Sequence, residues 1–403
     1  MKSILLSLWL LGGTGALAQS TTIAADFTSK PQVRWLFTTS SLFYGSPVVS
    51  GDLVYIGGLD SLFHAIQLQT GKEVWQFKTG AGIRSTATVV DELVYLNGGD
   101  GNIYCLDRHD GALEWVFQTG SNERYDFADY YDSSPVVVDG LLYAGSSDFN
   151  LYAIDAINGS EVWHYPTEGM VHTTPAVADG SVYFGSFDGY VYALDVRTGF
   201  LKWKFKTVGH RFFPKGEVQG SPAVIDHLVI LGARDYNVYA LDLEQGYCHW
   251  NKAFQKGWGL SNTMYKDTLY IAGADERMLM SVLPQSGFEC WKQPMEFLIF
   301  GNLAFSKKLL YVGTTNGKLH AYDRMTGEPL WQFVTEDYEE HKLDYFKEDD
   351  SYRDDIYSII KSNEQFLEVE CELGGVFSTP VLANDYLLFS STNGKLYCLE
   401  KGQ

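Results

Sequence analysis

The most varied side chains of this sequence stand at eight equivalent positions, each two residues before a small polar residue that opens a predicted strand. They offer one cation, one carboxylate, one imidazole, one amide and several aromatic rings. We call them the mouth residues: Tyr44, Arg84, Asp132, His172, Gln219, Leu260, Phe300 and Phe377. Polar groups that converge on a concave place indicate a binding site, so we expect these residues to ring the mouth of a central channel and bind a ligand. The alternative is that mouth positions vary because packing does not constrain them.

A second group of side chains falls in or near the long connections of the chain. It consists of Tyr125, Phe127, Tyr130, Tyr131, Arg211, Phe212, Phe213 and Trp258. Aromatic rings bury a large area on contact, so this group could bind a polysaccharide or protein partner. The same rings could instead cap the channel by packing on each other.

The sequence contains no complete catalytic motif. Its nine histidines show no H-E-x-x-H or other metal spacing, and neither a G-x-S-x-G elbow nor a phosphate-binding glycine loop occurs. We therefore expect no catalytic residue and no metal site. The formal net charge of −20 disfavours nucleic acid and anionic lipid, because like charges repel.

The element that must position these residues is a repeat marked by tryptophan. The spacings of 40, 40, 48, 40, 47, 41 and 40 residues separate Trp35, Trp75, Trp115, Trp163, Trp203, Trp250, Trp291 and Trp331. A period of 40 to 50 residues is typical of propellers and solenoids. Residues 174–206 contain four short apolar stretches, a hairpin signal at Asp188-Gly189 and no helical periodicity. The sequence predicts an all-β fold, an eight-bladed β-propeller with four-stranded antiparallel blades.

The two ends of the chain are expected to meet in the eighth blade. The final repeat begins at residue 377 and ends before a fourth strand. Residues 33–37 supply a spare strand that would complete it and remove two open edges.

Three connections are much longer than the repeat requires, and all three are expected on one face because each joins an outer strand to the next inner strand. They lie around residues 121–131, 209–216 and 336–373. The third has 14 acidic residues against Lys342, Lys347, Arg353 and Lys361. Its interleaved aromatics favour a partly helical lid over the ring. A solvated mobile loop is one alternative, and binding of a cationic partner or calcium by the acidic side chains is another.

The first 18 residues have the pattern of a secretory signal, with Lys2, a short apolar core and a small-x-small site ending at Ala18. We expect cleavage near Ala18, a single domain over residues 19–403, periplasmic or secreted localisation, and no direct insertion into a membrane.

The five cysteines do not form a disulfide framework. Cys105 and Cys398 replace a repeat Ala, and Cys248 and Cys290 are predicted on opposite strand faces. A bridge that involves Cys371 stays open.

The segment from Ala193 to Trp203 resembles the tryptophan-docking motif A-x-D-x-x-T-G-x-x-x-W of PQQ-like β-propellers, and the segment from Ala321 to Trp331 matches it in full. The partial matches cover nearly everything after the signal. The resemblance implies that the eight tryptophans are structural and wedge between neighbouring blades.

Proteins of the family that this chain resembles fall into two groups. Quinoprotein dehydrogenases hold pyrroloquinoline quinone (PQQ) and calcium over the propeller axis, and their alcohol dehydrogenases carry adjacent cysteines that this chain lacks. The β-barrel assembly lipoprotein of Gram-negative outer membranes binds proteins without catalysis. This chain resembles the second group in length, but it lacks the lipidation cysteine.

These observations favour an exported, monomeric, non-catalytic scaffold without a cofactor, which binds a protein or polysaccharide through the face that bears the insertions. One alternative is a dehydrogenase that uses PQQ and calcium, and another is a glycan-binding propeller.

Overall fold

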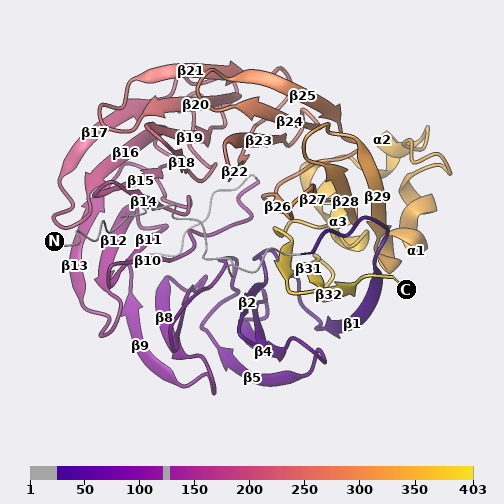
Figure 1. Ribbon diagram of the computed structural model, residues 1–403, viewed down its shortest axis with the longest axis horizontal. Coiled ribbons are helices and arrows are strands. Elements are labelled where there is room, and N and C mark those ends of the chain that lie inside the picture. Colours follow the sequence, from indigo (N-terminus) through magenta and orange to yellow (C-terminus); the bar gives the residue numbers. More distant parts are fainter. Residues whose placement is uncertain (1–24, 121–127, 403) are drawn as a thin grey trace, which may run out of the picture.

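The computed structural model describes residues 25–120 and 128–402. The expected signal segment, Tyr125 and Phe127 lie outside them. Eight four-stranded antiparallel sheets surround one axis as the blades of a propeller (Figure 1). The predicted fold is confirmed.

Each blade runs from an inner strand at the axis to an outer strand at the rim (Figure 1). Blade 1 consists of β2 (Val48–Ser50), β3 (Leu53–Gly57), β4 (Leu62–Gln67) and β5 (Glu73–Lys78), and blade 2 of β6 (Thr88–Val90), β7 (Leu93–Asn97), β8 (Asn102–Asp107) and β9 (Leu113–Gln118). Blade 3 consists of β10 (Val136–Val138), β11 (Leu141–Gly145), β12 (Asn150–Asp155) and β13 (Glu161–Pro166), and blade 4 of β14 (Ala176–Ala178), β15 (Ser181–Gly185), β16 (Tyr190–Asp195) and β17 (Leu201–Lys206).

The second half of the ring follows the same order until its last blade. Blade 5 consists of β18 (Ala223–Ile225), β19 (Leu228–Gly232), β20 (Asn237–Asp242) and β21 (Cys248–Ala253), and blade 6 of β22 (Ser261–Tyr265), β23 (Thr268–Gly273), β24 (Met278–Leu283) and β25 (Phe288–Pro294). Blade 7 consists of β26 (Ala304–Phe305), β27 (Leu309–Thr314), β28 (Lys318–Asp323) and β29 (Pro329–Val334), and blade 8 of β30 (Val381–Ala383), β31 (Tyr386–Ser390), β32 (Lys395–Glu400) and β1 (Gln32–Thr38).

The repeat tryptophans join each blade to the next by packing and by a hydrogen bond. Seven indole N–H groups donate to a backbone carbonyl just after the third strand of the following blade; the acceptors are Leu68, Arg108, Ala156, Val196, Leu243, Pro284 and Arg324. In the turn that follows this third strand, a glycine packs closely against the tryptophan ring. At Gly199 (φ 68°), a Cβ would stand 2.7 Å from the Trp163 ring, so this turn requires glycine.

Strand β1 closes the ring as predicted. It pairs antiparallel with β32, with Trp35 opposite Cys398 and Phe37 opposite Leu396. The sequence did not predict a second closing contact at Phe27. In the eighth blade, the Phe27 carbonyl accepts the Trp331 indole N–H at 2.6 Å. The fully buried Phe27 ring packs between blades 7 and 8.

Residues 336–373, which we call the lid, form three helices beside blades 7 and 8: α1 (Glu336–Tyr345), α2 (Ile356–Ile359) and α3 (Asn363–Glu372) (Figure 1). The hydroxyls of Thr335 and Ser362 cap α1 and α3 by accepting backbone N–H groups. The lid has its own apolar core on Phe297 and Leu298 of the preceding connection. The predicted helical content of this insertion is confirmed.

The five cysteines are free thiols, so the bridge left open for Cys371 is not formed. Over the described ranges, helices that are both long enough and apolar enough to span a bilayer are absent.

Candidate functional site

Residues 128–131, which we call the plug, lie across the mouth of the channel. They contact mouth residues of blades 1, 2, 4, 5, 7 and 8 through hydrogen bonds and ring packing. The structure therefore brings six of the eight predicted mouth residues together around a segment of its own chain. Ala128 has a φ of 51°, a left-handed conformation that costs a residue with a Cβ roughly 1–2 kcal/mol, so the docking contacts must outweigh this strain.

On one side of the mouth, the plug is held by aromatic rings. The Tyr130 ring stacks on Tyr44 at 5.7 Å and meets Phe300 and Phe377 edge-on at 5.0 and 4.9 Å. The Tyr131 hydroxyl donates to the Phe377 carbonyl at 2.7 Å. Burial raises the pKa of Tyr44, Tyr130 and Tyr131, so these phenols stay neutral. This half of the mouth is a box for one aromatic side chain.

On the other side of the mouth, polar groups hold the backbone and one carboxylate of the plug. Gln219 Nε2 donates to the Ala128 carbonyl at 2.7 Å, and Arg84 Nη1 donates to the Tyr130 carbonyl at 3.4 Å. Between them, His172 Nδ1 lies 2.8 Å from Asp129 Oδ1. Donors from three blades thus bind three consecutive residues.

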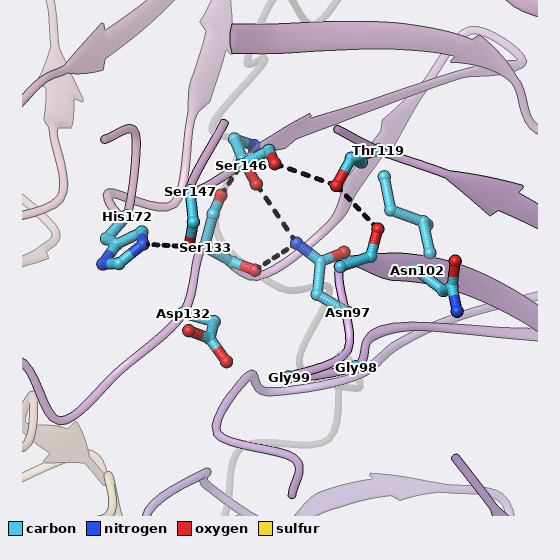
Figure 2. Close-up of a pocket in the computed structure, with 13 residues that line it drawn as sticks. Asn97, Gly98, Gly99, Asn102, Thr119, Asp132, Ser133, Ser146, Ser147 and His172 are labelled. Carbon is cyan, nitrogen blue, oxygen red and sulfur yellow. Dashed lines mark hydrogen bonds between the residues drawn. The ribbon is translucent and has the colours of Figure 1, made fainter. Parts of the chain in front are cut away.

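His172 also contacts Ser147 (Figure 2). Together with Asp129 on the other ring nitrogen, these residues have the order of a nucleophile, a base and an acid. Ser147 Oγ lies 2.8 Å from Nε2. An ionised carboxylate only accepts, so Nδ1 donates to Asp129 and the Nε2 of a neutral ring accepts the serine proton. Catalysis would also require donors for an oxyanion.

Three glycine amides near Ser147 are already bonded within the fold. The backbone N–H groups of Gly98, Gly99 and Gly145 donate to Asn102 O, Gly82 O and Ser133 Oγ. The hollow lined by Asp132, Ser133 and Ser147 has a volume of about 30 Å³, which is room for one or two waters. We therefore interpret Ser147–His172–Asp129 as a relay that positions the plug.

A buried arginine supports the polar side from behind. Arg234 is fully buried, and its Nε donates to Gln219 Oε1 at 2.9 Å. Its guanidinium carbon lies 5.0 Å from the ring centres of Phe187 and Trp258 and 5.8 Å from that of Phe213. This packing fixes Gln219 with its amide turned toward the plug.

The second predicted group, the side chains in or near the long connections, separates into buried and exposed residues. Trp258 is buried and Phe213 packs on it at 5.2 Å, whereas Phe212 is 60% exposed and the Arg211 guanidinium lies 4.3 Å from its ring. Tyr130 and Tyr131 pack into the mouth, in line with the capping alternative.

The lid reaches the same mouth through the end of α3. The carboxylate of Glu370 is buried and accepts the Thr315 hydroxyl. Burial raises the pKa of Glu370 to about 8, and the bond from Thr315 only partly offsets that rise. The next residue, Cys371, lies beside Tyr44, so the lid and the plug both contact this tyrosine.

A buried ion-pair network fastens the lid to blade 7. Lys318, 1% exposed, lies 2.9 Å from both Glu296 and Asp350, and Lys342 lies 2.6 Å from Asp350. Burial alone would raise the pKa of Asp350, but hydrogen bonds from Lys342, Lys318 and Tyr338 outweigh it and lower this pKa to about 2.

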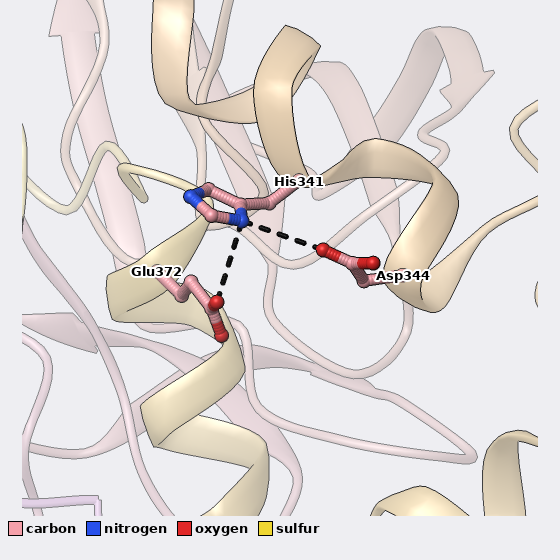
Figure 3. A group of neighbouring side chains, drawn as sticks. All are labelled: His341, Asp344 and Glu372. Carbon is pink, nitrogen blue, oxygen red and sulfur yellow. Dashed lines mark hydrogen bonds and ion pairs between the residues drawn. The ribbon is translucent and has the colours of Figure 1, made fainter.

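The lid also carries a group with metal-ligand chemistry, formed by His341, Asp344 and Glu372 (Figure 3). His341 Nδ1 lies 3.4 Å from a carboxylate oxygen of each partner. Both carboxylates are largely exposed, and the three groups pair with one another, which is the arrangement of a surface ion pair.

Several residues that build the site were not predicted from the sequence. Ser147, Phe187, Arg234 and Thr315 share one repeat position, directly before the acidic or amide residue of the hairpin turn; its eight members are Leu59, Gly99, Ser147, Phe187, Arg234, Asp275, Thr315 and Thr392. The residue types at this position differ from blade to blade, as they do among the mouth residues. This variation could have indicated from the sequence that the position contributes to the site.

Comparison with known proteins gives one family and several similar structures. The family model described as "Outer membrane protein assembly factor BamB" matches residues 22–251 and 126–333 in two overlapping placements. BamB from Moraxella catarrhalis is similar over 91% of this chain and 98% of its own, with 17% identity and a TM-score of 0.63. No curated protein matches the chain.

Dehydrogenases share the same architecture. A europium-containing methanol dehydrogenase matches over 95% of both chains, with 12% identity and a TM-score of 0.70. A quinohemoprotein alcohol dehydrogenase from Comamonas testosteroni matches over 95% of this chain and 78% of its own, with 14% identity and a TM-score of 0.72. At these identities the likeness is one of fold.

The mouth residues do not fit a quinone over the axis. Tyr130 fills the aromatic box, and the plug contacts six of the blades that would surround a cofactor. A second hollow, beside Arg84, has a volume of about 180 Å³, below the roughly 300 Å³ at which small-molecule sites begin. No two cysteines are adjacent.

Proposed function

This chain belongs to the family of PQQ-like β-propellers whose model is described as outer membrane protein assembly factor BamB, and we propose that it is an exported, non-catalytic scaffold of the cell envelope. It binds a protein partner through the face that bears the plug and the lid. The signal-like residues 1–18 direct it to the periplasm or the exterior, where it acts as a monomer.

The observation that carries this proposal is the way the mouth is occupied. Its donors and rings bind backbone carbonyls, a carboxylate and an aromatic side chain, which are the groups that a protein segment offers. Loops on a rigid ring are the usual carriers of binding function.

A capture experiment from a Gram-negative envelope extract tests the proposal. Immobilised protein is expected to retain specific envelope proteins, and a variant with residues 336–373 replaced by a short Gly-Ser linker is expected to lose them. The control is Phe200→Ala, in the Thr-Gly turn on the opposite face, where Phe200 is 75% exposed. Equal capture by the lid variant would contradict the proposal.

The quinoprotein alternative has its own test. When PQQ and calcium are added to the protein, the visible spectrum of the mixture is expected to equal that of free PQQ. No dye-linked oxidation of an alcohol is expected. A shifted absorbance band together with turnover would replace the scaffold proposal by a dehydrogenase.

A further inference from the structure

The plug shows which chemistry the mouth recognises, because each of its groups has a dedicated partner. The carbonyls of residues 128 and 130 accept from Gln219 and Arg84, the carboxylate of residue 129 faces His172, and the ring of residue 130 fills the aromatic box. The pattern comprises an acidic residue, an aromatic residue directly after it, and the two carbonyls that flank the acidic side chain.

The recognising groups are rigid and come from separate blades. Gln219 is fixed by Arg234, His172 by Ser147, and Phe377 stacks on Phe300 at 5.6 Å with the planes 14° apart. None of these six residues belongs to the insertion that carries the plug. The mouth is thus assembled by the ring, and the plug is a separable occupant.

We propose that the mouth is a peptide-binding site for an extended segment of a partner protein with an acidic residue directly followed by an aromatic one, and that the plug occupies this site in cis as a built-in competitor. This inference rests on the proposed scaffold function and names its recognition chemistry. A tethered competitor acts at an effective concentration of the order of millimolar, so a partner must bind tightly or present several contacts at once.

The test compares the closed mouth with an opened one. The opened variant carries Asp129→Ala and Tyr130→Ala, which remove the carboxylate and the ring of the plug. The probe is the labelled tetrapeptide Ala-Asp-Tyr-Tyr, blocked at both ends, and its binding is followed by fluorescence anisotropy. The control probe has the reversed order Tyr-Tyr-Asp-Ala, and the control variant is Phe212→Ala, in a rim loop outside the plug.

The opened variant is expected to bind the probe at least tenfold more tightly than the unaltered protein and the Phe212→Ala protein. Adding His172→Ala or Arg84→Ala to the opened variant is expected to weaken binding at least fivefold, and the reversed probe is expected to bind as weakly. If the double variant does not fold, Asp129→Asn, which keeps the Tyr130 ring, is expected to raise probe affinity at least threefold over the unaltered protein.

A folded opened variant that binds both probes equally, or neither, would overturn the inference. Its failure is distinguishable from that of the scaffold function, because capture of envelope proteins by the unaltered protein is measured separately. Capture without probe binding leaves the scaffold in place and removes only the peptide site.

Discussion

Replacing Phe27 by Ala is expected to destabilise the ring by about 3–5 kcal/mol, the range for truncating a buried phenylalanine. The Phe27 side chain is fully buried and meets Tyr311 edge-on at 6.3 Å. It lies in a core cluster shared with Leu382 and Phe389 of blade 8. The substitution leaves the carbonyl that accepts the Trp331 indole, so it removes the ring contacts alone.

The assay is equilibrium unfolding in urea, followed by tryptophan fluorescence. A lower midpoint at an unchanged slope would report a loss of stability of the folded ring. The matched control is Phe200→Ala, an exposed ring of the same type, which is expected to change stability by less than ~0.5 kcal/mol. If Phe27→Ala cost less than ~1 kcal/mol, residue 27 would not be a second closing contact.

Three further predictions concern closure, the lid and pH. Deleting residues 31–38 removes β1 and is expected to lower the melting temperature markedly, since β32 loses its outer partner; an unchanged melting temperature would refute the closure. Lys318→Met is expected to cost about 2–4 kcal/mol and to speed proteolysis within the lid, whereas Lys347→Met, at an exposed ion pair, changes little; equal effects of the two would contradict the anchoring role. Because the pKa of Asp350 is lowered to about 2, its ionised form stabilises the fold above pH ~4, and this stabilisation is lost as the pH falls toward 2. In acid unfolding, the stability of Asp350→Asn is therefore expected to depend less steeply on pH than that of the unaltered protein. For Glu370 the sign is opposite, because burial raises its pKa to about 8. The free energy of unfolding therefore falls between pH ~4.5 and 8 by at most roughly 5 kcal/mol. Glu370→Gln is expected to remove that fall in urea midpoints measured from pH 5 to 9.

The ring could be predicted from the sequence because its causes repeat. Seven of the eight repeat tryptophans pack on a glycine turn of the next blade, as Trp163 does on Gly199. This requirement gives the sequence its period of about 40 residues. The closure by β1 followed from counting strands. Phe27 could not be found in this way, because its contacts with Trp331 and blade 8 occur once and do not repeat along the chain.

The positions of the mouth residues could be predicted from the sequence, but their occupation by the plug could not. The eight mouth residues share a repeat position, but nothing in their spacing indicates that Tyr130 would enter the box formed by Tyr44, Phe300 and Phe377. The plug lies in an insertion with no second copy in the chain. The lid core on Phe297 and Leu298 escaped prediction for the same reason, since its contacts join two connections of unrelated sequence.

The most direct measurement of the scaffold account is site-specific photocrosslinking in an envelope extract. A photoreactive phenylalanine is placed at Tyr357 on the lid or at Ile157 on the opposite face, two side chains of similar exposure, 88% and 78%. The account predicts a discrete protein adduct from position 357 and none from position 157. Adducts from position 157 alone, or the same adducts from both positions, would contradict binding through the face of the plug and the lid.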